Sequence, residues 1–594
     1  MVGLFESMTA SMSRSGRSQF LSITLVAALF SLASQALWAD FAVQVGYYQK
    51  SYYAEETASG LRSAGYSVEM QPMLNQAGKA RIRLIVGPYP DRQTADDALR
   101  QLKEEGRDGF IINYSVPLPE KPKMAPSDAI TEPPPVITVA PMTPPPPDDI
   151  IPMEVQTDDV PASSPQLGVL APEPATEDNF VGLDDLEDGR SVLTTGFFQS
   201  EVAEVWPKPE HLSKFRNTLE VSGQGRVSNA MAWKISGRLA YDAVFDLNDY
   251  YSTAVRDDQQ FETSVRETYL DITRGDWDFR LGRQQIVWSE MVGLFFADVV
   301  SAKDLREFVL PELEILRIPQ WAVRGEYFKG DFHGEAIWIP YPTYNDIGVP
   351  GSEFYAYPTP PPPGYGMIIS GEHQPAGSLS DSNYGIRFSY LYNGWDMSAF
   401  YYDSMDTAPT FFREIISTPT PAFVYKPDHT RIEQLGGTLS KDLAAMVLKA
   451  EMIYTHDRWF ALDQLSDSDG VVRQDTLDYV VGLEYNLFRS SRFTMRLFQR
   501  WFPDHDPALT LDRVESGLSL SFSTSLLDGK VEPQLMVGNG LNRGDWLASP
   551  KLVWNLNGNW RWVMGADLFG GDRMGLFGQY DDKDRVYTEL RYIF

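Results

Sequence analysis

Charged residues of both signs gather in one stretch of the chain, which reads RLGRQQIVWSE at residues 280–290 and SAKDLREF at residues 301–308. The stretch interrupts an alternating pattern, because residues 301–320 place apolar residues at helical spacing and include two prolines. If it folds into the lumen of a channel, its charges set the potential that a passing ion meets. The candidate pore-lining residues are Arg283, Glu290, Asp304 and Arg306. The alternative is a loop outside the channel that ion pairs hold in place.

A second set of polar and aromatic residues lies near the N-terminus, in VQVGYY at 43–48 and ARIRLIVGPY at 80–89. If both are strands, alternation turns Val43 and Leu84 toward helices and leaves Gln44 and Arg83 on an open sheet face. Amide, guanidinium and phenol groups can hydrogen-bond a glycan and stack on its rings. The candidate glycan-binding residues are Gln44, Tyr47, Tyr48, Arg81, Arg83 and Tyr89. The alternative is a solvated sheet face without a ligand.

Signals for catalysis are weak. The six histidines show no metal-binding spacing, and neither a G-x-S-x-G motif nor a P-loop occurs. His505 lies in the acidic stretch FPDHDP, which we interpret as a solvated loop rather than a metal site. The absence of cysteine excludes thiolate metal sites, a cysteine nucleophile and disulfides. We therefore expect no enzyme, no catalytic residue, no metal and no cofactor, with a lipid hydrolase as the least favoured alternative.

The elements that carry the N-terminal set read strand, helix, strand, strand, helix, strand over residues 41–114, which predicts a small α+β sandwich. This unit resembles the SPOR domain. The resemblance lies in VQVGYY, in RLIVGPYPDRQTADDAL at 83–99 and in the closing GFIINY. It implies that the unit binds peptidoglycan glycan strands stripped of stem peptides.

Two segments flank this unit. Arg14 and Arg17 precede FLSITLVAALFSLASQALWA, which is typical of a secretory signal peptide, with an uncleaved membrane anchor as the alternative. After the unit, PPP at 133–135 and PPPP at 144–147 lie in an acidic stretch that cannot bury a core. We predict a signal peptide at 1–39, a SPOR-like peptidoglycan-binding domain at 40–116, a Pro-rich acidic linker at 117–190 and a β-barrel at 191–594.

The C-terminal region repeats segments of about ten alternating residues between turn residues. In AWKISGRLAYD at 232–242, for example, Ile235 and Leu239 oppose Ser236 and Arg238. Turns such as YNGWD, FKGDF and LDGKV are typical of hairpins. About 16–18 strands of this kind predict a transmembrane antiparallel barrel, with a soluble sandwich or propeller as the alternative.

The final segment, RVYTELRYIF at 585–594, alternates strictly and ends on an aromatic residue. It resembles the C-terminal signal of bacterial outer-membrane barrels, which implies recognition of Leu590, Tyr592 and Phe594 by the barrel-assembly machinery. The 280–321 region also resembles an uncharacterised family of proteobacterial outer-membrane barrels, through L-G-R-Q-x-x-x-W-[G/S]-E followed by D-V-V-x-x-x-D-L-R. These resemblances imply fold and location more than mechanism.

The net charge of −30 argues against nucleic acid as a partner. The predicted fold class is mainly β: a C-terminal transmembrane barrel with a small N-terminal βαββαβ domain. We expect an outer-membrane pore or transporter of a Gram-negative cell envelope, tethered to peptidoglycan by a periplasmic domain. The alternative is a plugged barrel that only anchors outer membrane to cell wall at division sites. The expected partners are peptidoglycan glycan strands, outer-membrane lipid and the barrel-assembly machinery.

Overall fold

The computed structural model describes two parts of the chain. The N-terminal part comprises residues 40–48, 57–59, 61–62, 65–74, 80–89, 92–104 and 110–114, and the C-terminal part comprises residues 192–594 except 229, 292–296, 376–377, 418–420, 444–445, 463, 465–466, 488–489 and 528. The predicted signal peptide and linker lie outside the described residues. None of the helices in these two parts is both long and apolar enough to cross a membrane.

The N-terminal part is one antiparallel sheet packed against helical residues. Its strand order is β2-β3-β1-β4, and the elements are β1 (Asp40–Tyr48), β2 (Val68–Leu74), β3 (Ala80–Tyr89), α4 (Arg92–Glu104) and β4 (Phe110–Tyr114). Val43, Leu84 and Val86 are fully buried with Leu102 of α4, as strand alternation predicts. The helical residues cover one face of the sheet through this core. The opposite face is the one on which the sequence predicts a binding site.

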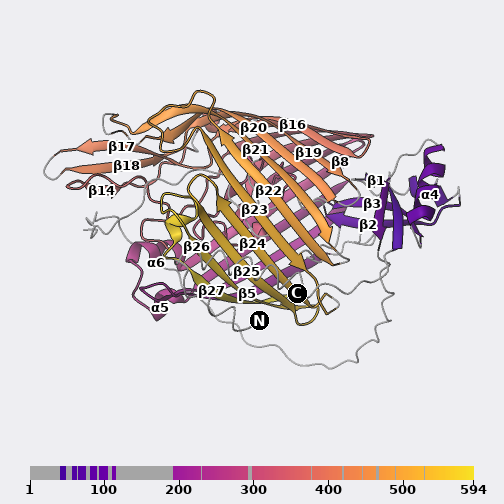
Figure 1. Cartoon of the computed structure of the whole chain (residues 1–594), viewed down its shortest axis with the longest axis horizontal. Coiled ribbons are helices and arrows are strands. Elements are labelled where there is room, and N and C mark those ends of the chain that lie inside the picture. The colour runs from indigo at the N-terminus through magenta and orange to yellow at the C-terminus, as the bar shows by residue number, and fades with distance from the viewer. Residues whose placement is uncertain are drawn as a thin grey trace, which may run out of the picture.

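The C-terminal part is a closed barrel of 18 antiparallel strands, within the predicted range of 16–18 (Figure 1). In chain order the barrel strands are β5 (Val192–Val205), β6 (His211–Ser228), β7 (Met231–Asp242), β8 (Phe261–Arg274), β9 (Trp277–Gln284), β12 (Gln320–Lys329), β13 (Phe332–Tyr341), β15 (Asn383–Tyr392), β16 (Trp395–Met405), β19 (Arg431–Asp442), β20 (Met446–Ala461), β21 (Val471–Leu487), β22 (Ser491–Trp501), β23 (Val514–Thr524), β24 (Val531–Gly540), β25 (Asp545–Asn555), β26 (Trp560–Gly570) and β27 (Arg585–Ile593).

Strand alternation separates an apolar outer face from a polar lumen. In β7, Ile235 and Leu239 are 56% and 43% exposed, whereas Ser236 and Asp242 on the opposite face are each 3% exposed. The exposed face of the barrel is rich in tryptophan, tyrosine, phenylalanine, leucine and valine. A soluble protein would turn such a face inward, so this barrel presents it to lipid.

The barrel closes between its first and last strands. β27 pairs with β5, and Phe594 and Gly196 exchange two backbone hydrogen bonds of 2.9 Å each. The ring of Phe594 stacks on Tyr592, and Tyr592 lies against Trp560. Closure leaves no strand edge unpaired, as a lipid environment requires.

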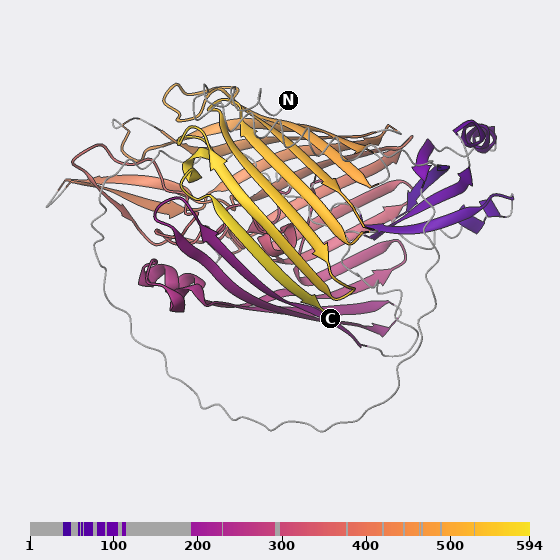
Figure 2. The same cartoon turned by 60° about the horizontal axis from the view of Figure 1, so that its bottom comes forward.

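The two ends of the barrel differ. At one end both chain termini of the barrel lie beside short hairpin turns, such as Asn393–Gly394 between β15 and β16, where both residues have positive φ. At the other end long connections carry further elements (Figures 1 and 2): α5 (Val244–Leu247), α6 (Thr253–Gln259), β14 (Gly366–Ile369), η2 (Leu379–Asp381), β17 (Thr410–Ile416), β18 (Ala422–Asp428) and η3 (Gly578–Tyr580). We call these the short-turn end and the long-loop end.

Candidate functional site

The connection between β9 and β12 folds inside the barrel. We call its described residues, 285–291 and 297–319, the internal loop; it carries β10 (Ala302–Lys303), α7 (Leu313–Leu316) and β11 (Arg317–Ile318). Its Glu307 contacts Lys214 of β6 and Arg585 of β27, while its Glu290 contacts Arg387 of β15. These wall strands lie on both sides of β9 and β12 in the ring. The internal loop therefore crosses the lumen, as one of the two sequence-based alternatives predicts.

Only part of the helical spacing in 301–320 becomes a helix. The described structure there is a two-residue strand pair and the single turn α7, separated by irregular backbone. Pro311 precedes α7, and Pro319 follows β11. Contacts with the wall on both sides of the lumen determine the backbone path here, and they override the local preference for a continuous helix.

Apolar residues of the internal loop form a core within the barrel. Trp288, Val300, Val309 and Leu316 are fully buried, and their cluster continues into wall residues such as Tyr402. Trp288 lies 5.2 Å from the ring of Phe400 and 5.7 Å from that of Tyr402. Burial of this kind contributes about 1.5–3 kcal/mol for each large side chain. The loop is thus packed as a plug and not only held by charges.

A buried carboxylate of the wall holds the start of the plug. Glu451 of β20 accepts hydrogen bonds from the hydroxyl of Ser289 at 2.7 Å and from the backbone amides of Glu290, Met291 and Ala297 at 2.7, 3.0 and 3.1 Å. The side chain is 2% exposed. A carboxylate that accepts several backbone amides fixes the path of the chain that donates them.

Two glutamates of the plug face a basic strip of wall. Glu307 contacts Lys214, Arg216 (2.8 Å) and Arg585 (3.1 Å). The next plug glutamate contacts two more arginines of the same strip, and the distances are Glu312–Arg561 2.6 Å and Glu312–Arg591 3.0 Å. These contacts join segments that lie 91–279 residues apart in the chain.

A small chamber of about 60 Å³ lies between the plug and this strip. Its charged wall residues are mostly basic: Lys214, Arg216, Arg238, Lys551 and Arg585 against Glu201, Glu262 and Glu589. The plug adds the opposite excess, with Arg306 against Asp304, Glu307 and Glu312. The plug therefore neutralises a wall that is positive by itself.

The predicted pore-lining residues do not all lie together. Arg306 is 6% exposed and contacts Asp304 and Glu262 at 2.6 Å each, so both predicted residues of SAKDLREF lie in the lumen. Glu290 reaches Arg387 at 3.1 Å across the lumen. Arg283 instead pairs in register with Trp321, whose side chain is 43% exposed on the outer face. Arg283 therefore does not share the ion pairs that hold the plug. That any of the four residues lines a conducting path stays a prediction.

A larger cavity of about 310 Å³ lies at the long-loop end. The plug forms one side through Val299, Leu305 and Phe308, and the loops and strand ends around the mouth form the rest. Aromatic residues Phe354, Trp459, Phe460 and Tyr580 also line it. Cavities of this size and character are typical of sites for small organic molecules.

Three loops and the first residue of β6 meet at one carboxylate beside the mouth. Glu353 accepts hydrogen bonds from His211 at 2.9 Å and from the hydroxyl of Tyr251 at 2.7 Å, and it contacts Lys583 at 3.1 Å. Burial opposes ionisation, but the hydrogen bond from His211 and the charge of Lys583 outweigh it and lower the pKa of Glu353 to about 2. The carboxylate therefore ties the loops together at neutral pH.

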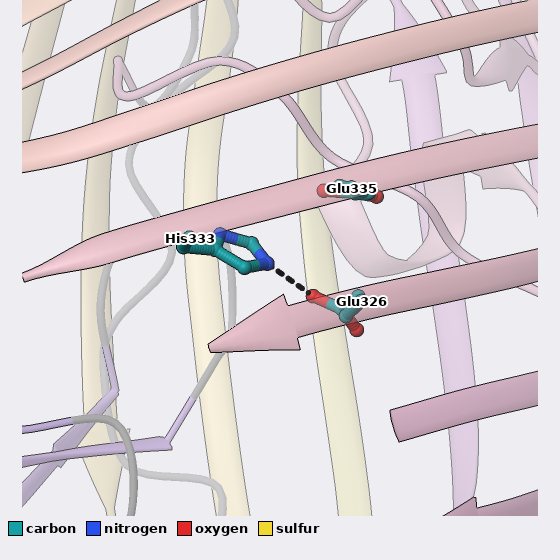
Figure 3. Close-up of side chains that lie close together, drawn as sticks. All are labelled: Glu326, His333 and Glu335. Carbon is teal, nitrogen blue, oxygen red and sulfur yellow. Dashed lines mark hydrogen bonds and ion pairs between the residues drawn. The ribbon is translucent and has the colours of Figure 1, made fainter. Parts of the chain in front are cut away.

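One cluster has the composition of a metal site. Glu326, His333 and Glu335 have ligand atoms within 4.8 Å of one another on β12 and β13 (Figure 3). Arg324, however, contacts Glu326 and Glu335 at 2.7 Å each, and Nε2 of His333 lies 2.9 Å from Glu326. The guanidinium supplies the positive charge that a metal ion would supply, so the cluster acts as an ion-pair network in the wall.

The predicted glycan-binding residues are only partly described. The backbones of Gln44, Tyr47, Tyr48 and Arg81 belong to β1 and β3, but their side chains lie outside the description. Arg83 is half-buried, and Ile85 on the same face is 1% exposed, so this face is not uniformly open. Tyr89 packs against the core of the unit, and its burial raises the pKa of the phenol. Their contact with a ligand stays a prediction.

The proposed assembly residues lie at the seam of the barrel. Leu590, Tyr592 and Phe594 belong to the terminal segment that pairs with β5, and Leu590 and Phe594 are 40% and 43% exposed on the outer face. Their recognition by the barrel-assembly machinery stays a prediction. Sequence reasoning did not single out Glu307 or Glu312. It places Glu451 on the polar side of the strand MVLKAEMIY but gives it no role.

The closed ring of strands and its apolar outer face define a class: a β-barrel of the outer-membrane type, joined to a small N-terminal domain. Residues 39–113 match the SPOR domain, which confirms the resemblance of that unit and its class as peptidoglycan-binding. Residues 210–594 match the family described as "Protein of unknown function (DUF1302)". The chain belongs to this family.

Several solved structures resemble the chain at low sequence identity. OccAB2 of Acinetobacter baumannii is 11% identical with a TM-score of 0.42 over 68% of this chain and 98% of its own. OccK8 (OprE) of Pseudomonas aeruginosa is 8% identical with a TM-score of 0.42 over 68% and 98%. OmpF of Salmonella typhi, solved in complex with daunomycin, is 10% identical with a TM-score of 0.36 over 69% and 99%. No curated protein matches the chain.

Proposed function

We propose that this protein is an outer-membrane transporter for a small organic solute, tethered to peptidoglycan through its SPOR domain. The observation that carries the proposal is the division of the lumen by the plug. A cavity of about 310 Å³ lies on the long-loop side and a charged chamber of about 60 Å³ lies along the wall. A solute that enters the cavity meets the plug before it can reach the chamber.

The two ends of the barrel support one orientation. Barrels of this class have short periplasmic turns and longer extracellular loops. The short-turn end also carries the first residue of β5, which follows the SPOR domain in the chain. We propose that this end faces the periplasm, so that the SPOR domain reaches the cell wall and the long-loop end faces the medium.

The plug supports transport by displacement more than by free diffusion. The ion pairs of Glu307 and Glu312 hold the plug to the basic strip, and the amide contacts of Glu451 hold it to β20 in another part of the wall, so these local anchors are separable. Release of one anchor can open the chamber side while the others hold the loop. Substrate binding in the cavity would favour the released state only if it contacts that state better.

Conductance in planar bilayers tests this proposal. The purified full chain is expected to give small discrete current steps, and addition of a transported solute is expected to change their frequency or size. A barrel inserted in the bilayer that gives no steps under any solute would contradict transport. Insertion is checked independently by heat-modifiable migration in electrophoresis.

A plugged barrel that acts only as an anchor is the second candidate function. The observation that favours it is the apolar cluster that joins plug residues such as Trp288 and Val309 to wall residues such as Phe498 and Phe569. Such a core is costly to open. In that case the protein would link outer-membrane lipid to peptidoglycan, and the bilayer experiment would show a folded, silent barrel.

A further inference from the structure

The charges around the long-loop cavity are not balanced by carboxylates. Its ionisable lining residues are Asp298, Asp406 and Asp478 against Lys303, Arg413, Arg458 and Arg500. Each aspartate already pairs with an arginine: the distances are Asp298–Arg317 2.9 Å, Asp406–Arg458 2.6 Å and Asp478–Arg500 2.6 Å. The cavity therefore has an excess of positive charge.

Arg413 differs from Arg458 and Arg500 because it bonds backbone carbonyls and not an aspartate side chain. It lies on β17 at the mouth and is 7% exposed. Its Nη2 donates to the backbone carbonyls of Gln464 and Asp467 at 2.6 Å each, and its Nε has no hydrogen-bond partner among the described residues. The carboxylate of Asp467 accepts from the amides of Asp469 and Gly470 instead. Backbone carbonyls and the hydroxyl of Tyr425 position this guanidinium, and the carboxylate of Asp467 acts on it only electrostatically, without a hydrogen bond in the contacts described. A buried donor left unpaired, as Nε is, is costly.

The basic wall behind the plug has the same sign. There Glu307 and Glu312 form ion pairs with the basic side chains, and the carboxylate of a solute could form the same contacts. An anion that passes the cavity could replace these contacts one for one, so its transfer would not strand the arginines without a partner.

From these two observations we infer that the cavity binds an organic anion with an apolar, ring-sized body, its anionic group on Arg413 and its body against Phe308 and Tyr580. This inference rests on the proposed function and names its substrate class. Nη2 of Arg413 already donates to two carbonyls, so the guanidinium would meet the anionic group with its charge and with Nη1. The aromatic lining gives the body of the solute a surface on which to stack.

Binding to the detergent-solubilised full chain tests the inference without any need for conduction. The probes are 2-naphthoate, the neutral 2-naphthamide and the cationic 2-naphthylmethylammonium, followed by titration calorimetry. We expect 2-naphthoate to bind at least tenfold more tightly than the other two. Equal affinity for the ammonium probe, or no measurable binding of 2-naphthoate at millimolar concentration, would overturn the inference.

Two variants locate the site. Arg413→Gln is expected to weaken 2-naphthoate at least tenfold, and Arg413→Lys, which keeps the charge, less so. The matched control is Arg256→Gln on α6, an exposed arginine that does not line the cavity, and it should bind as the natural chain does. Full affinity in both folded Arg413 variants would refute the assignment. A chain that conducts but does not bind the anion refutes this inference alone, whereas one that binds it but never conducts refutes transport alone.

Discussion

Replacing Glu307 with glutamine should loosen the plug. The side chain is 11% exposed and neutralises Lys214, Arg216 and Arg585 together. Removing one partner of a buried ion pair destabilises by about 3–5 kcal/mol, because the remaining charge is left uncompensated. Each of the three cations retains a wall carboxylate, such as Asp567 at 2.9 Å from Arg585. We therefore use the lower end of this range, about 3 kcal/mol, for the destabilisation.

A change of about 3 kcal/mol corresponds to roughly a hundredfold shift in the ratio of released to docked plug, since about 1.4 kcal/mol is a factor of ten. Open probability in single-channel recordings of Glu307→Gln should rise by up to that factor. Glu312→Gln should act in the same direction through Arg561 and Arg591.

The matched control is Glu414→Gln on the projecting strand β17. Glu414 pairs only with Lys426 in the contacts described, and both side chains are 55% exposed, so this change should leave the recordings unaltered. Recordings of folded Glu307→Gln that match those of the natural chain would refute the reasoning that these charges hold the plug.

Three further predictions concern other parts of the molecule. Phe594→Asp should reduce the yield of heat-modifiable, membrane-integrated barrel, because it puts a charge on the strand that closes the sheet; a normal yield would contradict an assembly role. Replacing Gln44 and Arg83 with alanine should weaken binding of the full chain to purified glycan strands about tenfold with little change in melting temperature, and equal binding would move the ligand to another face. Since the pKa of Glu353 is lowered, its contribution to loop order is present above about pH 4.5 and is lost as the pH falls toward about 2. A nitroxide on a cysteine introduced in the β26–β27 loop, in a chain with no other cysteine, should gain mobility over that window, and Glu353→Gln should be mobile at neutral pH; a label equally rigid at both ends of the window would contradict the tie.

The groups that matter for function are this chain's own residues: a plug held by Glu307, Glu312 and Glu451, and a mouth cavity with a carbonyl-bound Arg413. These are the groups that the experiments address. The N-terminal unit is a SPOR domain, a class of domain that binds peptidoglycan.

The barrel and the domain order could be predicted from the sequence because they depend on local patterns. A strand that faces lipid on one side and a lumen on the other must alternate, so AWKISGRLAYD and RVYTELRYIF each indicate a wall strand by themselves. The SPOR unit likewise shows its alternating strands and its helix within about 75 residues. Because each barrel strand shows its alternation by itself, the number of barrel strands could also be predicted to within two.

Only the tertiary structure decides what fills the lumen. The sequence left SAKDLREF either inside the barrel or outside it, since a mixed-charge segment satisfies both. The choice depends on the register of the closed ring, which brings Lys214, Arg216 and Arg585 to one point of the wall opposite Glu307. The same register pairs Arg283 with Trp321, whose side chain lies on the outer face. Contacts between residues hundreds of positions apart follow from closure and stagger of the whole sheet, and no local pattern carries that information.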